Sequence, residues 1–302
     1  MKLTLIAALT GAAMAIPATA QQIAGFNIGV LGGENAQDRM TSNECLRKYA
    51  EEELGVPVKL FTPADYDGVI QGLLGGTLDM AILGASGYAK AYLTDPEAVE
   101  PVLVKTNLDG SSTYYSIGFA RADSGVKSMD NLKGKVLGFG DPNSTSGYLI
   151  PAVEMPKAGY PVQPGAYFSD VKFTGGHEQT IVAVVNGDVA GGVTWADGQG
   201  EWEDGYNSGA LRKAADSGIV DMNDIVEIWR SSPIPEGPVV LRKALPHDVK
   251  DKMTALMAGL VEKDQECAYG VASGETAGFA PVLHDAYQTI IEVRQTKEAA
   301  GS

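Results

Sequence analysis

The chain has 302 residues, 44% of them hydrophobic and 20% charged, and its formal net charge is −15. This acidic balance argues against nucleic acid or an anionic membrane surface as a partner, but a local ring of donors can still hold a small anion because distant charges are screened. The ~280 residues that follow the leader described next exceed the usual size of one hydrophobic core, so we expect two lobes.

Residues 1–20 have the pattern of a secretory signal peptide. Lys2 gives a basic start, residues 3–16 are almost wholly apolar, and Ala18-Thr19-Ala20 is a small-x-small cleavage site. We therefore expect cleavage after Ala20 and a periplasmic mature protein. The residue directly after the cleavage site is Gln21 and not a cysteine, and no later segment approaches ~20 uninterrupted apolar residues, so we expect neither a lipid anchor nor membrane insertion of the mature chain.

The first part of the mature chain alternates between strand and helix patterns. Strands are predicted at 26–30, 56–61, 79–83 and 114–120, and helices over 39–54, 66–74 and a segment that begins after residue 87. Repeated strand–helix units predict a mainly parallel sheet with helices on both faces.

After residue 120 the same pattern starts again. The predicted elements are strands at 135–139, 171–173, 192–195, 225–229 and 239–241, a helix around 181–185, and mostly helix from 248 to the end. We expect lobe 1 to comprise 21–118 and 236–302, with lobe 2 (119–235) inserted between them. Two crossings, near 115–121 and 233–240, suit hinge closure around a ligand in the interlobe cleft.

The chain contains two cysteines, Cys45 and Cys267. In an oxidising compartment they can form a disulfide that ties an N-terminal helix to a C-terminal one, and two buried free thiols are the alternative. Neither has the neighbours expected of a metal site or a catalytic thiol, so we predict no metal and no cofactor.

One motif combines three consecutive hydroxyl residues with a predicted strand-to-helix turn. It is the run Gly140-Asp141-Pro142-Asn143-Ser144-Thr145-Ser146-Gly147-Tyr148. A helix N-terminus has unpaired N–H groups and about half a positive charge. Hydroxyls there either cap the helix or donate to a bound oxyanion.

Four other segments, together with this run, occur in an order along the chain that can be compared with known families. They are Asp65-Tyr66, Tyr114-Tyr115-Ser116, Gly176-His177-Glu178 and Ile228-Trp229-Arg230-Ser231. Together they resemble the periplasmic phosphonate-binding proteins of ABC transporters (PhnD type), over essentially the whole mature chain. The resemblance implies a two-lobed α/β fold of the type II periplasmic binding proteins. It also implies a monomeric receptor, not an enzyme, that delivers a phosphonate to an inner-membrane ABC permease.

The resemblance also implies a set of ligand contacts. Ser144, Thr145 and Ser146 would hold the phosphonate oxygens, with His177 from a neighbouring loop of the same lobe. Tyr66 and Tyr114 would donate from the opposite side. Because alternate residues of a strand face opposite ways, Tyr115 is expected to pack in the core instead. As a donor, His177 would favour the imidazolium form next to an anion.

The substituent of the phosphonate sets a further requirement, since the ammonium of 2-aminoethylphosphonate needs a carboxylate. In relatives that bind this compound, two acidic residues bind the ammonium, and the position of one of them corresponds to Asp197. The second corresponds to Gly237, so that acid is missing, although the adjacent Glu236 can substitute. Solvated loop carboxylates are the alternative interpretation of Asp197 and Glu236, and Trp195 can pack against the substituent.

Two other functions remain to be weighed. A receptor for phosphate, phosphite or a sulfonate would use the same oxyanion site. An exported serine hydrolase or phosphatase would use Ser144 or Ser146 as nucleophile and His177 as base. The hydrolase is disfavoured because the run is not a Gly-x-Ser-x-Gly elbow and no His-Glu-x-x-His motif is present.

Overall fold

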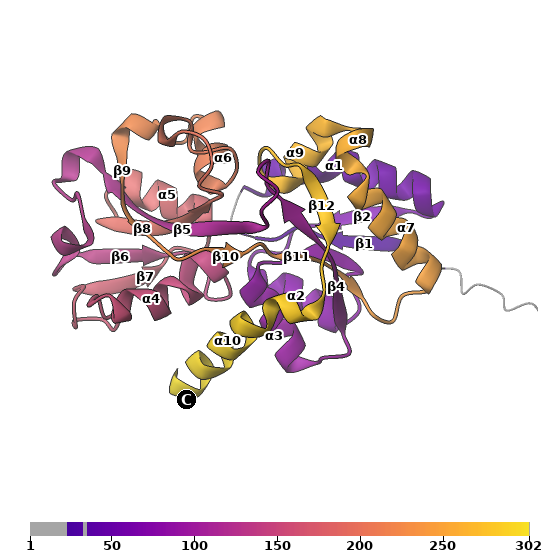
Figure 1. The fold of residues 1–302 in the computed structure, drawn as a ribbon, viewed down its shortest axis with the longest axis horizontal. Helices are drawn as coiled ribbons and strands as arrows, with labels where there is room; N and C mark the ends of the chain where they lie inside the picture. Colours follow the sequence, from indigo (N-terminus) through magenta and orange to yellow (C-terminus); the bar gives the residue numbers. More distant parts are fainter. Residues whose placement is uncertain (1–22, 33–34, 302) are drawn as a thin grey trace, which may run out of the picture.

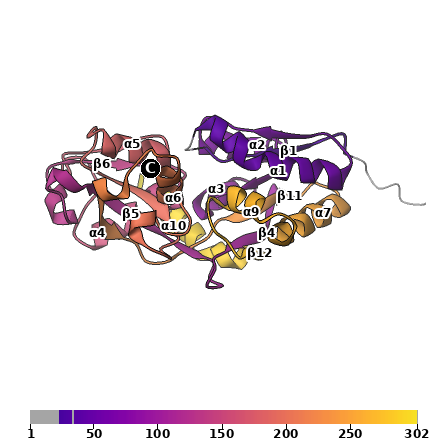
Figure 2. The ribbon, with the colours of Figure 1, turned by 90° about the horizontal axis from the view of Figure 1, so that it is seen from above.

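The computed structural model describes residues 23–32 and 35–301, and the expected signal peptide lies outside them. The chain forms two lobes, each built on a six-stranded sheet, and the lobes lie side by side along the long axis of the molecule (Figures 1 and 2). Within the described ranges, no helix is both long enough and apolar enough to cross a bilayer.

The first lobe contains the N-terminal and C-terminal parts of the chain. Its strands are β1 (Phe26–Gly29), β2 (Val58–Phe61), β3 (Met80–Ile82), β4 (Val99–Thr106), β11 (Pro238–Arg242) and β12 (Gly278–Pro281). They lie in the order β12-β4-β11-β3-β1-β2. The neighbouring pairs β1–β2 and β1–β3 are parallel, whereas β11 runs antiparallel to both β3 and β4, and β12 antiparallel to β4.

Helices cover both faces of this sheet. They are α1 (Ala36–Leu54), α2 (Tyr66–Leu74), α3 (Ala85–Thr94), α7 (His247–Ala258), α8 (Leu260–Lys263), α9 (Gln265–Ala272) and α10 (Gln288–Gly301). Buried side chains of α1, α7, α8 and α9 pack in one hydrophobic core, and those of α2, α3 and α10 in another. Cys45 of α1 and Cys267 of α9 form a disulfide, with 5.8 Å between their Cα atoms, which confirms that an N-terminal helix is tied to a C-terminal one.

The second lobe repeats this plan. Its strands are β5 (Thr113–Arg121), β6 (Val136–Phe139), β7 (Asp170–Phe173), β8 (Gly191–Ala196), β9 (Ile225–Arg230) and β10 (Ile234–Pro235), and its helices are α4 (Pro151–Lys157), α5 (His177–Val185) and α6 (Ala210–Asp216). The order is β10-β5-β8-β6-β7, with β9 also paired to β5. The α/β fold class is confirmed, but both sheets are mixed, because the strands next to the crossings run antiparallel to their neighbours.

The first crossing lies earlier in the chain than we expected. All of β5 belongs to the second sheet, where it pairs with β8, β9 and β10, so the expected boundary at 118/119 falls inside a strand. The chain crosses first in the segment 107–112, between β4 and β5, and again at Glu236 and Gly237, between β10 and β11.

Two strands of the first sheet were not predicted from the sequence. β4 contains Pro101, which disfavours a central strand, but its pairing with β11 shifts register beside that proline and so accommodates it. β12 is a short edge strand bounded by Gly278 and Pro281, inside a region predicted to be helical. Tertiary pairing therefore decides the conformation of both segments.

Candidate functional site

A cavity of about 180 Å³ lies between the lobes, at the carboxyl ends of several strands. Seven of the residues expected to bind a ligand line it: Tyr66, Tyr114, Ser144, Thr145, Ser146, His177 and Glu236. All seven are buried. The eighth, Asp197, is buried as well but does not line the cavity.

Two helices begin at the wall of this cavity. α3 starts after Gly84 and α5 starts at His177, and both Gly84 and His177 line the cavity. The N-cap residues Gly84 and Gly176 provide no side-chain cap, and in the first turn of α3 the N–H of Ser86 donates to Thr145 Oγ1. The exposed N–H groups and the positive ends of both helix dipoles therefore favour an anion at this place.

The hydroxyl run forms the third wall. Ser144 caps a single π-type turn over Thr145–Leu149, and its Oγ accepts the N–H of Gly147 at 2.9 Å. Ser144 Oγ also lies 3.2 Å from His177 Nε2, while His177 Nδ1 lies 3.2 Å from Thr194 Oγ1. The helix-cap interpretation and the ligand interpretation are thus compatible, because one hydroxyl can accept hydrogen bonds and donate another.

His177 is held in its neutral form in this environment. Burial lowers its pKa to about 4, and its two ring nitrogens face hydroxyls instead of a carboxylate. Our expectation of an imidazolium concerns the site with a bound anion; without one, burial favours the neutral form. A neutral imidazole still offers one N–H donor. The absence of an acidic partner on Nδ1 also differs from the usual nucleophile–base–acid arrangement of serine hydrolases.

Tyr114 belongs to β5 in the same lobe as the hydroxyl run and lies beside Thr145 and Ser146, so it does not approach from the opposite side as we expected. Burial raises the pKa of its phenol, the neighbouring hydroxyls of Ser146 and Thr145 oppose that shift, and the phenol stays protonated. Ser116 Oγ donates to the carbonyl of Ser146 at 2.6 Å and fixes that turn against β5. Tyr115 faces away from the cavity, as strand alternation predicts, and stacks on the guanidinium of Arg230 at 5.3 Å.

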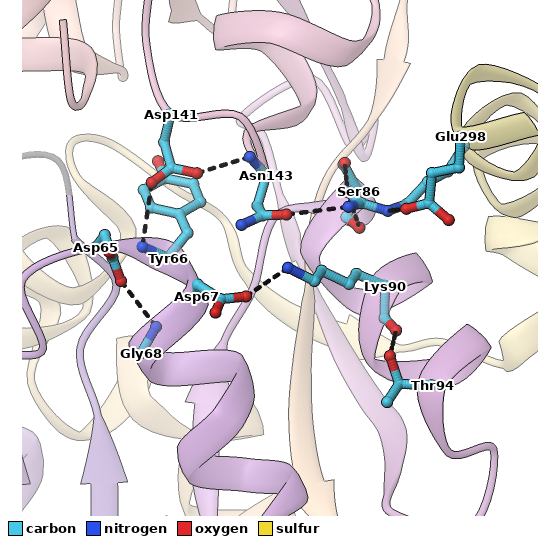
Figure 3. Close-up of polar contacts among 11 residues, drawn as sticks. Asp65, Tyr66, Asp67, Gly68, Ser86, Lys90, Thr94, Asp141, Asn143 and Glu298 are labelled. Atoms are coloured by element: carbon cyan, nitrogen blue, oxygen red, sulfur yellow. Dashed lines mark hydrogen bonds and ion pairs between the residues drawn. The ribbon is translucent and has the colours of Figure 1, made fainter. Parts of the chain in front are cut away.

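Several hydrogen bonds join the two lobes around the cavity, so the structure is a closed form. In Figure 3, Asp141 of the second lobe faces the backbone of Tyr66 in the first, whose N–H it accepts at 3.3 Å. The N–H of Ser86 donates to Thr145 Oγ1 at 2.9 Å. On the far side, the N–H of Asn35 donates to Glu178 Oε2 at 3.1 Å.

Arg294 of α10 adds a further link between the lobes. It donates to Ser86 Oγ in the first lobe at 2.8 Å and to Asn143 Oδ1 in the second at 3.0 Å, while Glu298 accepts from its Nε. The same contacts are drawn in Figure 3. In both overall views α10 lies at the junction of the lobes (Figures 1 and 2). The C-terminal helix therefore contributes directly to closure.

The end of the cavity next to the crossings is charged. Lys105 of β4 pairs with Glu236 at 3.4 Å between Nζ and Oε1, and both side chains are at least nine-tenths buried. Lys105 also donates to Ser208 Oγ of the second lobe, and its ammonium lies 5.5 Å from the centre of the Trp195 ring. Sequence reasoning missed Lys105 because its strand was not predicted. The signal was a lysine directly after the apolar run 102–104.

The two acidic positions inferred from the resemblance differ in their geometry. The Asp197 carboxylate accepts the N–H of Gln199 at 3.2 Å in a local turn, which keeps it out of the cavity wall. At Gly237 a Cβ would lie 1.8 Å from the carbonyl oxygen of Leu83, so this backbone admits no acid there. Of the two candidate carboxylates, Asp197 and Glu236, only Glu236 belongs to a residue that lines the cavity.

Burial raises the pKa of Glu236, Lys105 opposes that shift, and Asp197 adds to it. Among the residues described, no three His, Cys, Asp or Glu side chains are grouped as metal ligands. The cavity lining therefore offers hydroxyls, backbone N–H groups, an imidazole and the Lys105–Glu236 pair, and it also includes Lys213 and Arg39, whose guanidinium donates to the carbonyls of Val30 and Leu31.

Residues 28–287 match the family described as "ABC transporter, phosphonate, periplasmic substrate-binding protein". The chain is 30% identical to the phosphonates-binding periplasmic protein of Escherichia coli, with 91% of this chain and 76% of that protein covered. It is 27% identical to the phosphate-import protein PhnD of Mycolicibacterium smegmatis, covering 86% and 84%.

Solved structures show the same fold. A binding protein component of an ABC phosphonate transporter from Pseudomonas aeruginosa has a TM-score of 0.77 at 24% identity, covering 92% of this chain and 89% of that one. PhnD1 of Prochlorococcus marinus, in complex with methylphosphonate, also has a TM-score of 0.77, at 18% identity and 91% and 98% coverage. The chain belongs to the periplasmic substrate-binding proteins of phosphonate ABC transporters.

Proposed function

We propose that the protein binds a phosphonate in the interlobe cavity and delivers it to an inner-membrane ABC permease. The observation that carries the proposal is that the hydroxyls of Ser144–Ser146 at a helix start, the phenol of Tyr114 and the imidazole of His177 line one cavity between the lobes. A tetrahedral oxyanion has acceptor oxygens in several directions, and this arrangement supplies donors from more than one of them.

Ser144 is the donor whose geometry is most fully determined. When the Thr194 hydroxyl donates to His177 Nδ1, the imidazole carries its proton on Nε2 and donates to Ser144 Oγ. The N–H of Gly147 donates to the same oxygen. With both lone pairs occupied, the Ser144 hydroxyl hydrogen is left to donate to the ligand.

Closure would be coupled to binding because the donors come from both lobes. Tyr66 and the first turn of α3 belong to the first lobe, whereas the hydroxyl run and His177 belong to the second. A ligand that contacts both sets stabilises the closed form relative to an open one. A closed form with a bound anion is then the species presented to the permease.

The ligand is expected to be small. Cavities for drug-sized molecules usually measure about 300–1,000 Å³, and this one measures about 180 Å³. Methylphosphonate, which the Prochlorococcus protein holds, and 2-aminoethylphosphonate are both small phosphonates. Inorganic phosphate is the second candidate, because the mycobacterial relative is a phosphate-import protein. Phosphite and a sulfonate are further alternatives.

The test is calorimetry with methylphosphonate, 2-aminoethylphosphonate, phosphite, phosphate and methanesulfonate. We expect at least one phosphonate to bind more tightly than methanesulfonate, and the mature protein not to turn over p-nitrophenyl phosphate. Binding of none of the five would overturn the proposal. Tighter binding of phosphate than of every phosphonate would favour the second candidate, and turnover would favour the hydrolase.

A further inference from the structure

The hinge end of the cavity already contains a positive charge supplied by the protein. Lys105 precedes the first crossing and Glu236 lies in the second, and both line the cavity. Their side chains are 7% and 10% exposed, and Nζ lies 3.4 Å from Oε1. The Glu236 carboxylate therefore does not face the cavity as an unpaired negative charge.

Lys105 also covers the aromatic surface at this end. Its ammonium lies 5.5 Å from the centre of the Trp195 ring, within the range of a cation–π contact. A carboxylate and an indole face are the two features that attract an ammonium. Lys105 is in contact with both of them.

A second ammonium at this end would meet a like charge in a poorly hydrated site. Two like charges a few ångströms apart disfavour each other, and more strongly when water is excluded. Asp197 is close enough to affect the pKa of Glu236, but its carboxylate is turned away from the cavity wall. Lys105 and Glu236 together present no net charge to the substituent of a ligand.

We infer that Lys105 takes the place of a ligand ammonium, so that the site selects phosphonates whose substituent is uncharged over aminoalkylphosphonates. The inference rests on the proposed function and specifies its ligand class. Glu236 Oε1 is fully buried and makes no hydrogen bond within the described residues, so the Lys105 ammonium at 3.4 Å is the charge that balances it. Lys105 thus acts as a specificity-determining residue.

The decisive experiment compares two ligands of nearly equal size. Propylphosphonate and 2-aminoethylphosphonate differ only in a terminal CH₃ against NH₃⁺. By calorimetry on the wild-type mature protein we expect propylphosphonate to bind at least tenfold more tightly. Equal affinities, binding of neither compound, or tighter binding of 2-aminoethylphosphonate would overturn the inference. If methylphosphonate and phosphate also fail to bind, the proposed function itself fails.

Lys105→Met identifies the residue responsible, because methionine is unbranched and apolar and cannot pair with Glu236. We expect this variant to shift the ratio of the two affinities at least tenfold toward 2-aminoethylphosphonate. Lys90→Met is the matched control, since Lys90 pairs with Asp67 on the surface of the first lobe and does not line the cavity. An unchanged ratio in a folded Lys105→Met protein would contradict the assignment. If that variant does not fold, the wild-type ligand pair still decides the inference.

Discussion

The two ends of the cavity use different chemistry. The end that we propose to hold the oxyanion, here called the oxyanion end, is lined by neutral groups, namely the hydroxyls of Ser144–Ser146, the phenol of Tyr114, and a histidine whose pKa is lowered by burial. The hinge end relies on one buried ion pair, Lys105 with Glu236. Neutral donors fit any tetrahedral oxyanion, whereas a fixed charge pair discriminates among substituents. Affinity for the anion and choice of the substituent are therefore separable by mutation.

The largest effect is expected from breaking the charge pair at the hinge end. Glu236→Gln leaves the buried ammonium of Lys105 without its counter-charge, and removing one partner of a buried pair typically costs about 3–5 kcal/mol. We expect a clear fall in the free energy of unfolding, measured by urea denaturation without ligand. Glu97→Gln is the control, because the Glu97–Lys243 pair is exposed. Equal free energies of unfolding for the two variants would show that the Lys105–Glu236 pair does not contribute strongly to stability.

The next effect belongs to the oxyanion end and depends on pH. Burial lowers the pKa of His177 from 6.5 to about 4, so above pH 6.5 it is neutral in both the folded and unfolded states. As pH falls from 6.5 toward 4, the unfolded state takes up a proton that the folded state resists, and stability decreases. The difference corresponds to about 3 kcal/mol.

The measurement is the free energy of unfolding between pH 7 and pH 4, without ligand, for wild type and His177→Gln. Glutamine keeps an amide donor and acceptor but does not titrate. We expect the wild type to lose more stability than the variant over this interval. Parallel curves for the two proteins would mean that His177 is protonated in the folded state, in contradiction to its burial among hydroxyls.

Ser144→Ala tests the neutral donors themselves. A hydrogen bond to a charged group typically contributes about 1.5–3 kcal/mol, so we expect a loss of roughly 10- to 100-fold in affinity. Methylphosphonate, propylphosphonate and phosphate should all be affected to a similar extent in calorimetry, because Ser144 is proposed to contact only the oxyanion. Ser42→Ala, on the surface of α1, should leave affinity unchanged. A loss of affinity for only one of these ligands would mean that Ser144 also senses the substituent. The oxyanion end and the hinge end would then no longer have separate roles.

The sequence predicted the oxyanion end better than the hinge end, for a physical reason. Ser144, Thr145 and Ser146 stand at a strand-to-helix turn, which is a local feature, and alternation along β5 correctly separated Tyr114 from Tyr115. The position of Lys105 depends instead on a strand that forms only by pairing with distant segments.

The orientation of the Asp197 carboxylate could not be predicted from the sequence either. Its position in the chain, two residues after Trp195 of β8, suggested a carboxylate in the cavity. The carboxylate instead accepts a hydrogen bond from Gln199 in its own turn, and only the three-dimensional structure shows this. Gly237 is likewise explained by a distant contact, because the carbonyl of Leu83 occupies the space that a side chain would need.

The smallest effect concerns a contact that should serve both ends equally. Asn143→Ala removes the acceptor through which Arg294 links α10 to the second lobe, while Arg294 keeps its contact with Ser86. One hydrogen bond to a charged group, partly replaced by water when the lobes open, is expected to shift closure by about 1 kcal/mol. Affinity for every ligand should therefore fall about fivefold by calorimetry, with the ratio between propylphosphonate and 2-aminoethylphosphonate unchanged.

Glu298→Ala, which removes only the exposed partner of Arg294 on α10, is the control. A changed ratio in Asn143→Ala would mean that closure itself selects the substituent, and the separate roles assigned to the two ends would then have to be abandoned.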